Sequence, residues 1–564
     1  MKICGASKAE ILMEMTTHTT ASWSAAVLCR FRTIGNRPKS ARGSAHSKTW
    51  RRLGSFLALL PLSASAAPAL PAFPGAEGFG ANATGGRGGD VYYVTNLEDI
   101  GPGSLRHGIS SAKGPRSILF KVSGNIKLRD SLIVNKPNIT IAGQTAPGDG
   151  ICFQDYTFGI RANDVIVRHI RTRLGTNARQ QDDAFSLNGG TNVIVDHCSA
   201  SWSVDETLSP AGNAQNLTVQ WTYITESLNK SIHSKGPHGY GSLIRVRADA
   251  SYTFHHDLYA HHSSLNPRPG VYGDYVLRLD FRNNVIYNWG HHAGYDNFVT
   301  EHVELNYVNN YLVAGPSTTW FESAFASSGT NTAIYQSGNR FDVNRNGHLN
   351  GTNSEWAMFS GALTKEENPF TAPPVWTDPA AAAYERVLAL GGALPWRRDR
   401  VDARVTADVR NETGKIIDAT DEVGGWPELK SEEAPLDSDN DGMSDVWEQA
   451  MGLNPRDATH GNKIAASGYT QLEEYLNWLG DLHAVAPRNT ATDVNLQTLC
   501  GGSTNLSFKV ESAANGSVKL SKDGHTARFA PKKDFHGLAS FKFLATDSAT
   551  GITFGPETVR VLVR

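Results

Sequence analysis

The stretch Val193-Ile-Val-Asp-His197 is a short run of β-branched residues that ends in a polar pair. Runs of the same kind recur at intervals of roughly 24–35 residues, as stacked repeats do. The other runs are Asn138–Ala142, Val165–Ile170, Leu217–Trp221, Tyr252–His256, Leu279–Asn284 and Val303–Asn310. No amphipathic helix pattern separates them, so residues 90 to 345 are predicted to form a parallel β-helix. The alternative, a β-sandwich, usually shows turns about every 8–12 residues.

Asparagine recurs at turn-like positions in this region, at Asn283–Asn284, Asn309–Asn310 and Asn339. Asparagine tolerates left-handed backbone angles better than most residues. We therefore expect these asparagines to stack at the corners of successive coils and to form hydrogen bonds along the solenoid.

Composition divides the chain into five predicted segments. They are a leader with a signal peptide (1–67), the parallel β-helix (68–360), a helical and polar appendix (361–432), an EF-hand-like calcium segment (433–484) and a β-sandwich of immunoglobulin or cadherin type (485–564). In the appendix a short helix is predicted over Pro379–Leu390, followed by a polar stretch. The calcium segment is expected to carry helices at Asp445–Met451 and Gln471–Leu479.

The leader has the parts of a secretory signal. A basic Lys48–Arg52 precedes the apolar Phe56–Leu62, and the small residues Ser63–Ala67 follow. We expect a secreted protein, outside the cell or in the periplasm or at the cell surface, with its true translation start inside the first fifty residues. No other stretch is apolar enough to span a membrane, and a monomer is expected.

The net charge limits the kinds of partner, and the cysteines allow two arrangements. A net charge of −2 and an isoelectric point near 6.8 argue against nucleic acid and anionic membranes as partners. Beyond the leader, Cys152 and Cys198 form either a disulfide, which export permits, or two buried thiols. Cys500 stands alone, and no Cys/His set has the spacing of a zinc site.

Residues 437–448 match the EF-hand calcium loop. Carboxylates stand at loop positions 1, 3, 5, 9 and 12, the sharp turn at position 6 is a glycine, and position 7 offers a main-chain carbonyl. The residues are Asp437, Asp439, Asp441, Asp445, Glu448, Gly442 and Met443. The loop predicts bound Ca²⁺, and a single loop of this kind is more often a structural clip than a sensor.

Acidic and basic side chains gather within the predicted solenoid. Asp183 and Asp205 fall on successive coils, about 5 Å apart, and are predicted to share one hard cation. Lys230 and Arg268 are expected on the next coils of the same side. A groove with carboxylates, a metal, lysine and arginine suits a polyanionic sugar.

Six motifs then follow one another in an order typical of one family. They are Phe73-Pro-Gly-Ala-Glu-Gly-Phe-Gly80, Thr84-Gly-Gly-Arg-Gly-Gly89, Ile139-Thr-Ile-Ala-Gly-Gln-Thr-Ala-Pro-Gly-Asp149, Val195-Asp-His-Cys-Ser-Ala-Ser-Trp202, His238-Gly-Tyr-Gly241 and Asp280-Phe-Arg-Asn-Asn-Val-Ile-Tyr-Asn-Trp289. In these motifs the chain resembles exported bacterial pectate lyases of polysaccharide lyase family 1. The resemblance runs from about residue 70 to 345.

The resemblance implies an all-β, right-handed parallel β-helix that cleaves polygalacturonate, the de-esterified form of pectin, by calcium-assisted β-elimination. The site residues that we expect are catalytic Arg268 and Lys230, substrate-binding Lys235, His238, His262 and Arg282, and the metal ligands Asp183 and Asp205. Asp205 matches the first acid of the family's calcium segment, whereas Ser209 stands where the second acid is expected.

The proton acceptor departs from the family pattern. The family carries an arginine two residues before a proline, and here Leu265 occupies that place before Pro267. A second arginine three residues after the proline is replaced by Gly270. Three explanations remain open: Arg268 takes the role, Lys230 or Lys235 acts as the base, or the protein binds pectin without cutting it.

Other classes of function compete with the lyase. A catalytically impaired, calcium-dependent pectin-binding protein is favoured by Leu265. A glycoside hydrolase on the same fold needs two carboxylates beside the bond, which Asp182, Asp183, Asp205 and Glu206 would supply. A pure adhesin, argued only from the C-terminal sandwich, ranks last.

Overall fold

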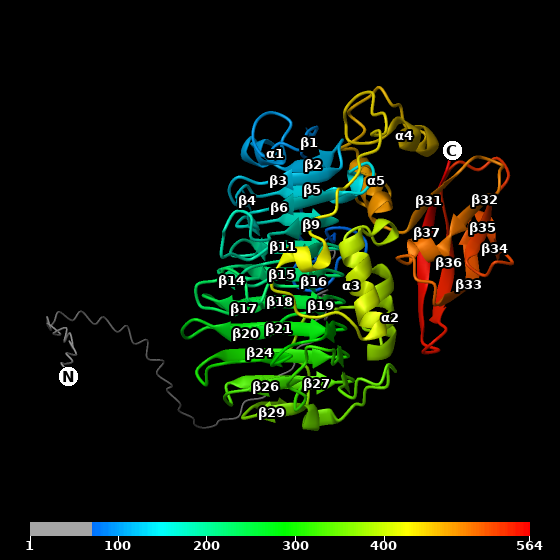
Figure 1. The fold of residues 1–564 in the computed structure, drawn as a ribbon. Coiled ribbons are helices and arrows are strands. Elements are labelled where there is room, and N and C mark those ends of the chain that lie inside the picture. The colour runs from blue at the N-terminus through cyan, green and yellow to red at the C-terminus, as the bar shows by residue number, and fades with distance from the viewer. Residues whose placement is uncertain (1–69) are drawn as a thin grey trace, which may run out of the picture. The chain divides into compact units, whose positions relative to one another are not determined.

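The computed structural model describes residues 70–564, so the predicted signal peptide and the rest of the leader lie outside the described residues. Short strands joined by corners wind the chain into a parallel β-solenoid (Figure 1). Its first face is an 11-stranded parallel sheet: β1 (Asp90–Val94), β2 (Arg116–Phe120), β5 (Ile139–Ala142), β8 (Val165–Arg168), β11 (Thr191–Asp196), β15 (Gln215–Gln220), β18 (Ala250–His255), β21 (Val276–Arg282), β24 (His302–Val308), β27 (Thr332–Ser337) and β30 (Thr364–Glu366). Each of the seven runs predicted from sequence supplies a strand of this face, which confirms the β-helix.

Two further faces close each coil. The second face is the parallel sheet of β3 (Gly124–Lys127), β6 (Ile151–Gln154), β9 (Ile170–Arg173), β12 (Ser199–Ser201), β16 (Tyr223–Thr225), β19 (Leu258–Ala260), β22 (Val285–Tyr287), β25 (Tyr311–Val313) and β28 (Arg340–Asp342). The third face is broken into three short parallel sheets: β4 (Leu132–Val134), β7 (Phe158–Ile160), β10 (Phe185–Ser186) and β13 (Leu208–Ser209); β14 (Ala211–Gly212), β17 (Leu243–Val246) and β20 (Arg268–Val271); and β23 (Gly294–Tyr295), β26 (Phe325–Ser327) and β29 (Phe359–Gly361).

The corner between the first and second faces repeats one backbone shape. His169, His197, Trp221, His256 and Asn283 all have a φ near +50°, between +47° and +56°. The side chains of this corner stack from coil to coil. The ring of Trp221 lies between those of His197 and His256, at centroid distances of 5.8 and 4.2 Å.

The predicted asparagine ladder follows the same corner. The main-chain N–H of Asn284 donates to Oδ1 of Asn310 at 3.0 Å, and that of Asn310 donates to Oδ1 of Asn339 at 2.9 Å. These bonds satisfy backbone donors that the sheet ladder leaves unpaired at the bend. The prediction of stacked asparagines is confirmed.

Two helices cover the second face. They are α2 (Ala380–Leu390), which matches the predicted helix, and α3 (Arg400–Asn411). Helix α3 was not predicted, because the stretch reads as polar; its apolar residues Val405 and Val409 pack on the face with Tyr287. Buried ion pairs fix α3, since Arg173 contacts Asp399 at 2.5 Å and Asp402 at 2.8 Å.

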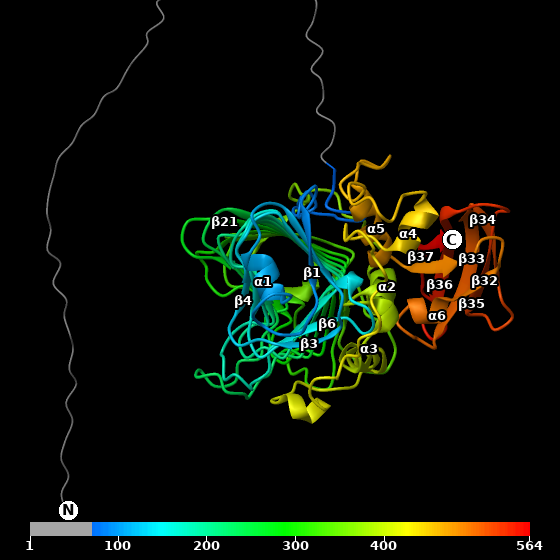
Figure 2. The ribbon, with the colours of Figure 1, turned by 90° about the horizontal axis from the view of Figure 1, so that it is seen from above.

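The remaining elements follow in chain order. Short helices are α1 (Leu105–Ser110), α4 (Asp445–Met451), α5 (Gln471–Gly480) and α6 (Leu496–Leu499), with 3-10 turns at Gly143–Thr145, Glu355–Met358, Pro395–Arg397 and Thr420–Val423. The C-terminal strands are β31 (His483–Ala486), β32 (Thr492–Asn495), β33 (Leu506–Ala514), β34 (Gly516–Leu520), β35 (Thr526–Pro531), β36 (Gly537–Asp547) and β37 (Thr553–Val563), arranged in two sheets. Figure 2 places α2 between the solenoid and strands β36 and β37.

The structure bears on two sequence expectations, one about membrane-spanning segments and one about the cysteines. Within residues 70–564, no helix is both long and apolar enough to cross a membrane. Cys152, Cys198 and Cys500 are buried free thiols, so of the two alternatives for Cys152 and Cys198 the structure has the unpaired one.

Candidate functional site

An acidic cluster forms on the third face, where two coils lie in register. Strand β10 pairs with β13, and Phe185 stands opposite Leu208. The same register places Asp183, two residues before Phe185, next to Glu206. The carboxylates of Asp183, Asp205 and Glu206 each have an oxygen within 4.8 Å of the others. The structure therefore brings Asp183 and Asp205 together as the spacing predicts, and adds Glu206.

Burial and mutual repulsion shape the charges of this cluster. The pKa of Asp183 is raised well above its usual range by burial and by the neighbouring Glu206 and Asp205. Burial, then the Asp205 charge, raises the pKa of Glu206 to about 8. Three carboxylates this close repel one another unless a cation or protons neutralise them. The all-oxygen donor set suits a hard divalent cation.

Two stacked histidines hold Asp205. His238 Nε2 lies 2.7 Å from Asp205 Oδ1, and the His233 ring stacks on that of His238 with centroids 3.8 Å apart. Burial alone raises the pKa of Asp205, but contact with His238 and the nearby His233 outweigh it, and the pKa is lowered. His238 was expected to bind substrate; the structure places it as a partner of a cluster carboxylate.

The cluster continues into a groove along the third face. The backbone of Glu206 forms an isolated parallel β-bridge with Tyr240 on the next coil. Tyr240 forms another with Ser264 on the coil after it. Tyr240 and Ser264 line a groove of about 760 Å³. Its other walls include Lys230, Tyr295, His292 and Trp320. Acidic groups at one end, a cation on the wall and aromatic rings beyond are features of a site for an extended, negatively charged chain.

Both lysines of the expected site belong to one loop beside the cluster. Lys230 is exposed on the groove wall, and its main-chain N–H donates to Asp418 Oδ1 at 2.9 Å. The N–H of Lys235 donates to His233 Nδ1 at 3.1 Å, so Lys235 lies next to the histidine pair with its own side chain exposed. The N–H of Ser234 donates to Gln181 Oε1, which ties this loop to the coil of Asp183.

Arg268 is not exposed in the groove. It begins β20 with its side chain 6% exposed and ion-paired to Glu301 at 3.1 Å. Leu265, the residue in place of the family's arginine, is buried as well, with a φ of +62°. The geometry therefore gives no support to Arg268 as the proton acceptor.

His262 and Arg282, both expected to bind substrate, lie away from the acidic cluster. His262 is buried; the Ser227 hydroxyl lies 2.7 Å from its Nδ1 and the Ile224 carbonyl 2.8 Å from its Nε2. Arg282 ends β21 on the first face and donates to Asp280 at 2.5 Å. In a solenoid, residues close in sequence can lie on different faces. The clustering of charged residues in the sequence does not reveal which face each one takes.

Glu206 is the cluster residue that the sequence analysis did not include among the metal ligands. The family comparison looked for a second acid at Ser209, and the structure buries Ser209 in β13, where its hydroxyl accepts from the N–H of Leu243 at 2.9 Å. The acid next to Asp205 faces Asp183 instead. The signal that could have found it is the coil register itself, since Asp183 and Glu206 precede their strands by the same two residues.

The EF-hand-like loop forms a second, separate acidic cluster. Asp437, Asp439 and Asp441 each place an oxygen within 4.8 Å of the others. Neither carboxylate oxygen of the buried Glu448 has a hydrogen-bond partner among residues 70–564. Burial, then the Asp441 charge, raises the pKa of Glu448 to about 8. Unpartnered buried carboxylates beside further carboxylates fit a calcium ion.

The remaining loop positions are also placed. Asp445 turns back to Ser438, whose N–H and hydroxyl donate to it at 2.8 and 2.7 Å. Met443 is fully buried, beside Gly442 with its φ of +104°. A Cβ on Gly442 would lie 2.6 Å from Leu472 of helix α5, so the turn requires glycine.

The fold and the site together define the class: a parallel β-solenoid protein with a carboxylate cluster beside a groove lined by a lysine and aromatic rings. Comparison with known proteins narrows this class. Over 439 residues the chain is 38% identical to a probable pectate lyase C of Emericella nidulans, covering 76% of this chain and 97% of that protein. A probable pectate lyase C of Aspergillus fumigatus is 37% identical over 437 residues, covering 75% of this chain and 97% of that protein.

The chain therefore belongs to the pectate lyase family. These relatives are fungal, so they do not support the expectation of a specifically bacterial group. No family model matches the sequence. Among solved structures, the cedar pollen allergen Jun a 1 is 18% identical, with a TM-score of 0.42 and coverage of 55% of this chain and 90% of that one. A pectate lyase structure is 17% identical, with a TM-score of 0.41 and coverage of 56% and 96%.

Proposed function

We propose that this protein is a secreted pectate lyase that cleaves polygalacturonate by calcium-assisted β-elimination. The observation that carries the proposal is the cluster of Asp183, Asp205 and Glu206 at one end of a groove, in a chain of the pectate lyase family. The groove, at about 760 Å³, has room for several sugar units. Secretion rests on the predicted signal peptide, and a monomer remains part of the proposal.

In the proposed reaction the cluster and the groove wall have separate tasks. Asp183, Asp205 and Glu206 hold Ca²⁺, and His238 keeps Asp205 in place. When bound, calcium would neutralise the C6 carboxylate of a galacturonate unit and thereby acidify its C5 proton. Aromatic rings along the groove, such as those of Tyr240 and Trp320, position the sugar chain.

We assign removal of the C5 proton to the amine of Lys230. Arg268 is held by Glu301, and Leu265 carries no base. As the C5 proton leaves, its electron pair forms a C4=C5 double bond while the C4–O4 bond breaks. The departing O4 takes a proton from water, so the products are an unsaturated uronate end and a new reducing end.

The proposed functional segments keep the predicted bounds. Residues 68–360 carry the lyase, 361–432 cover the second face, 433–484 form a calcium clip and 485–564 form the sandwich. Calcium at the clip is proposed from the unpartnered oxygens of Glu448 and the cluster of Asp437, Asp439 and Asp441.

The test is purified mature protein with polygalacturonate at mildly alkaline pH, in calcium and in EDTA, followed by ultraviolet absorbance of unsaturated uronates. Calcium-dependent product supports the lyase. Lys230→Met is then expected to lower kcat by about 100-fold or more, the scale of general-base catalysis. Lys235→Met on the same loop is the matched control and should stay within about threefold, because Lys235 does not line the groove.

A second candidate is a pectin-binding protein that does not cut. Leu265 and Gly270 favour it, since they replace both arginines of the family pattern, and the nearby Arg268 is buried and paired to Glu301. Calcium-dependent binding to the polymer without any unsaturated product would establish this function and overturn the lyase.

A further inference from the structure

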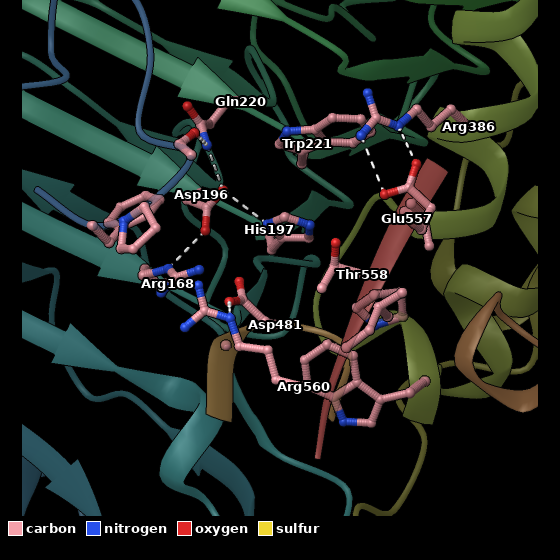
Figure 3. A pocket seen from close by; sticks show the side chains of 18 of the residues that line it. Arg168, Asp196, His197, Gln220, Trp221, Arg386, Asp481, Glu557, Thr558 and Arg560 are labelled. Atoms are coloured by element: carbon pink, nitrogen blue, oxygen red, sulfur yellow. Dashed lines mark hydrogen bonds and ion pairs between the residues drawn. The ribbon is translucent and has the colours of Figure 1, made fainter. Parts of the chain in front are cut away.

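A second pocket lies at the other side of the solenoid, away from the acidic groove. Its volume is about 400 Å³, and its walls come from five parts of the chain (Figure 3). The solenoid supplies Arg168, Asp196, His197 and Trp221; the remaining walls include Phe73, Arg386, Trp396, Asp481 and Arg560. We name this cavity the junction pocket, because it exists only where these parts meet.

The polar groups of the junction pocket are held in fixed positions by one another. Arg168 Nε donates to Asp196 Oδ2 at 2.7 Å, and Asp196 Oδ1 lies 2.8 Å from His197 Nδ1. Arg560 Nε lies 3.0 Å from Asp481 Oδ2. Each guanidinium therefore uses its Nε for an internal ion pair, which orients the group. Arg168 is buried, and its guanidinium lies 3.9 Å from the ring centroid of Phe73, another wall of the pocket.

Among residues 70–564, no hydrogen bond is made by the Nη nitrogens of Arg168 or Arg560, or by Nε2 of His197. Figure 3 shows the guanidinium groups of Arg168 and Arg560 on the same side of the pocket, with Asp481 next to the Arg560 guanidinium. Guanidinium groups placed in this way bind a carboxylate with paired, charge-assisted hydrogen bonds.

The opposite wall combines an aromatic ring with acceptors. Trp221 is fixed between His197 and His256, and the Arg386 guanidinium lies 5.1 Å from its ring centroid. Glu557 accepts from Arg386 Nε at 2.6 Å. Histidine rings cover both faces of Trp221, so the ring offers its edge to the pocket, and the carboxylate of Glu557 is an acceptor for the hydroxyl groups of a sugar.

We infer that the junction pocket binds a small carboxylated sugar of one or two units. The carboxylate is assigned from Arg168 and Arg560 alone, whereas the sugar rests on the proposed function. A ligand there would contact the solenoid, α5 and β37 at once. Because the pocket is separate from the groove, it would recognise short uronates independently of the polymer bound there.

The experiment uses saturation-transfer NMR of galacturonate and galactose with the mature protein. It is made in wild type and in Asp205→Asn, which removes a carboxylate of the groove cluster. Thr558→Tyr is designed to fill the pocket, because Thr558 is an exposed residue of β37 on the pocket wall. Thr553→Tyr, at an exposed position of the same strand outside the pocket, is the matched control. Circular dichroism checks that each variant is folded.

Galacturonate is expected to bind wild type, Asp205→Asn and Thr553→Tyr alike. It should bind Thr558→Tyr about tenfold more weakly, and galactose should bind wild type about tenfold more weakly than galacturonate. Loss of the signal in Asp205→Asn, or full binding in Thr558→Tyr, would overturn the junction site, as would no signal at all. Equal binding of galactose would overturn the carboxylate assignment. Retained galacturonate binding in a protein that produces no unsaturated product would instead remove the proposed function.

Discussion

The two acidic clusters of this molecule have similar chemistry and opposite origins. In the loop of residues 437–448, three aspartates gather because they are two residues apart in one tight turn. In the groove, Asp183 meets Asp205 and Glu206 only because one coil lies in register with the next. The comparison teaches that a local cluster should act on the stability of its own segment, whereas a cluster built between coils should act on what lies in the groove.

The largest expected effect breaks the groove cluster and leaves the loop intact. Asp205→Asn should lower the rate of polygalacturonate cleavage by about 1,000-fold, because a metal that neutralises charge in the transition state contributes several kcal/mol. Unsaturated product formation at saturating calcium measures this loss. Asp274→Asn, an exposed acid on the turn between β20 and β21, is the control and should keep wild-type activity. A fall of less than tenfold in Asp205→Asn would place the catalytic metal elsewhere.

Glu448→Gln should break the loop and leave the groove intact. In calcium the variant should lose about 2–3 kcal/mol of unfolding free energy, the contribution of a ligand at about a hundredfold excess over its Kd. In EDTA at pH 8 the sign should reverse or vanish, because burial and the Asp441 charge disfavour the ionised Glu448. Denaturant unfolding in both buffers tests this change of sign.

Glu433→Gln, an exposed neighbour of the loop, provides the matched control and should change neither curve. An equal loss of stability for Glu448→Gln in calcium and in EDTA would mean that Glu448 is only a packing residue.

Acidification sharpens the comparison with a smaller effect that comes from a buried histidine of the solenoid. Burial lowers the pKa of His262 to about 3, so the folded protein keeps this ring neutral while the unfolded chain protonates it near pH 6.5. The unfolded state therefore binds more protons between about pH 6.5 and 3, and stability is lost as the pH falls through this window. The loss is about 1.4 kcal/mol per pH unit for this one group.

Unfolding in urea at pH 7.5, 6 and 5 measures the slope, and His262→Gln should reduce it relative to wild type. An unchanged slope in this variant would show that other groups carry the acid sensitivity. The buried ring of His256, whose pKa burial lowers to about 4, is the first of these to examine.

Much of the fold could be predicted from the sequence because its signals are local. Strand runs such as Val193–His197 carry β-branched residues at a recurring spacing, and the asparagine corners follow from the left-handed backbone angles that asparagine tolerates. Helices α2, α4 and α5 begin and end near their predicted positions. Helix α3 was missed because its apolar stripe is narrow, and only packing on the second face makes it a helix.

The candidate site could be predicted in part. Asp183 and Asp205 meet as expected, since a coil spacing brings successive repeats together. Arg268, His262 and Arg282 were expected beside them, but the solenoid turns each toward a different surface: Arg268 to Glu301, His262 to the interior and Arg282 to Asp280 on the first face. The number of residues between strands decides which face a side chain takes, and loop lengths vary from coil to coil.

The sequence by itself determined the repeating strands and the acidic loop of residues 437–448, because both depend on residues that are neighbours in the chain. Only the tertiary structure decided that Glu206 joins the groove cluster, that Arg268 is buried, and that Arg168 and Arg560 share a pocket. These pairs lie on different coils or segments, and their distances are set by register and docking, which no local pattern of residues encodes.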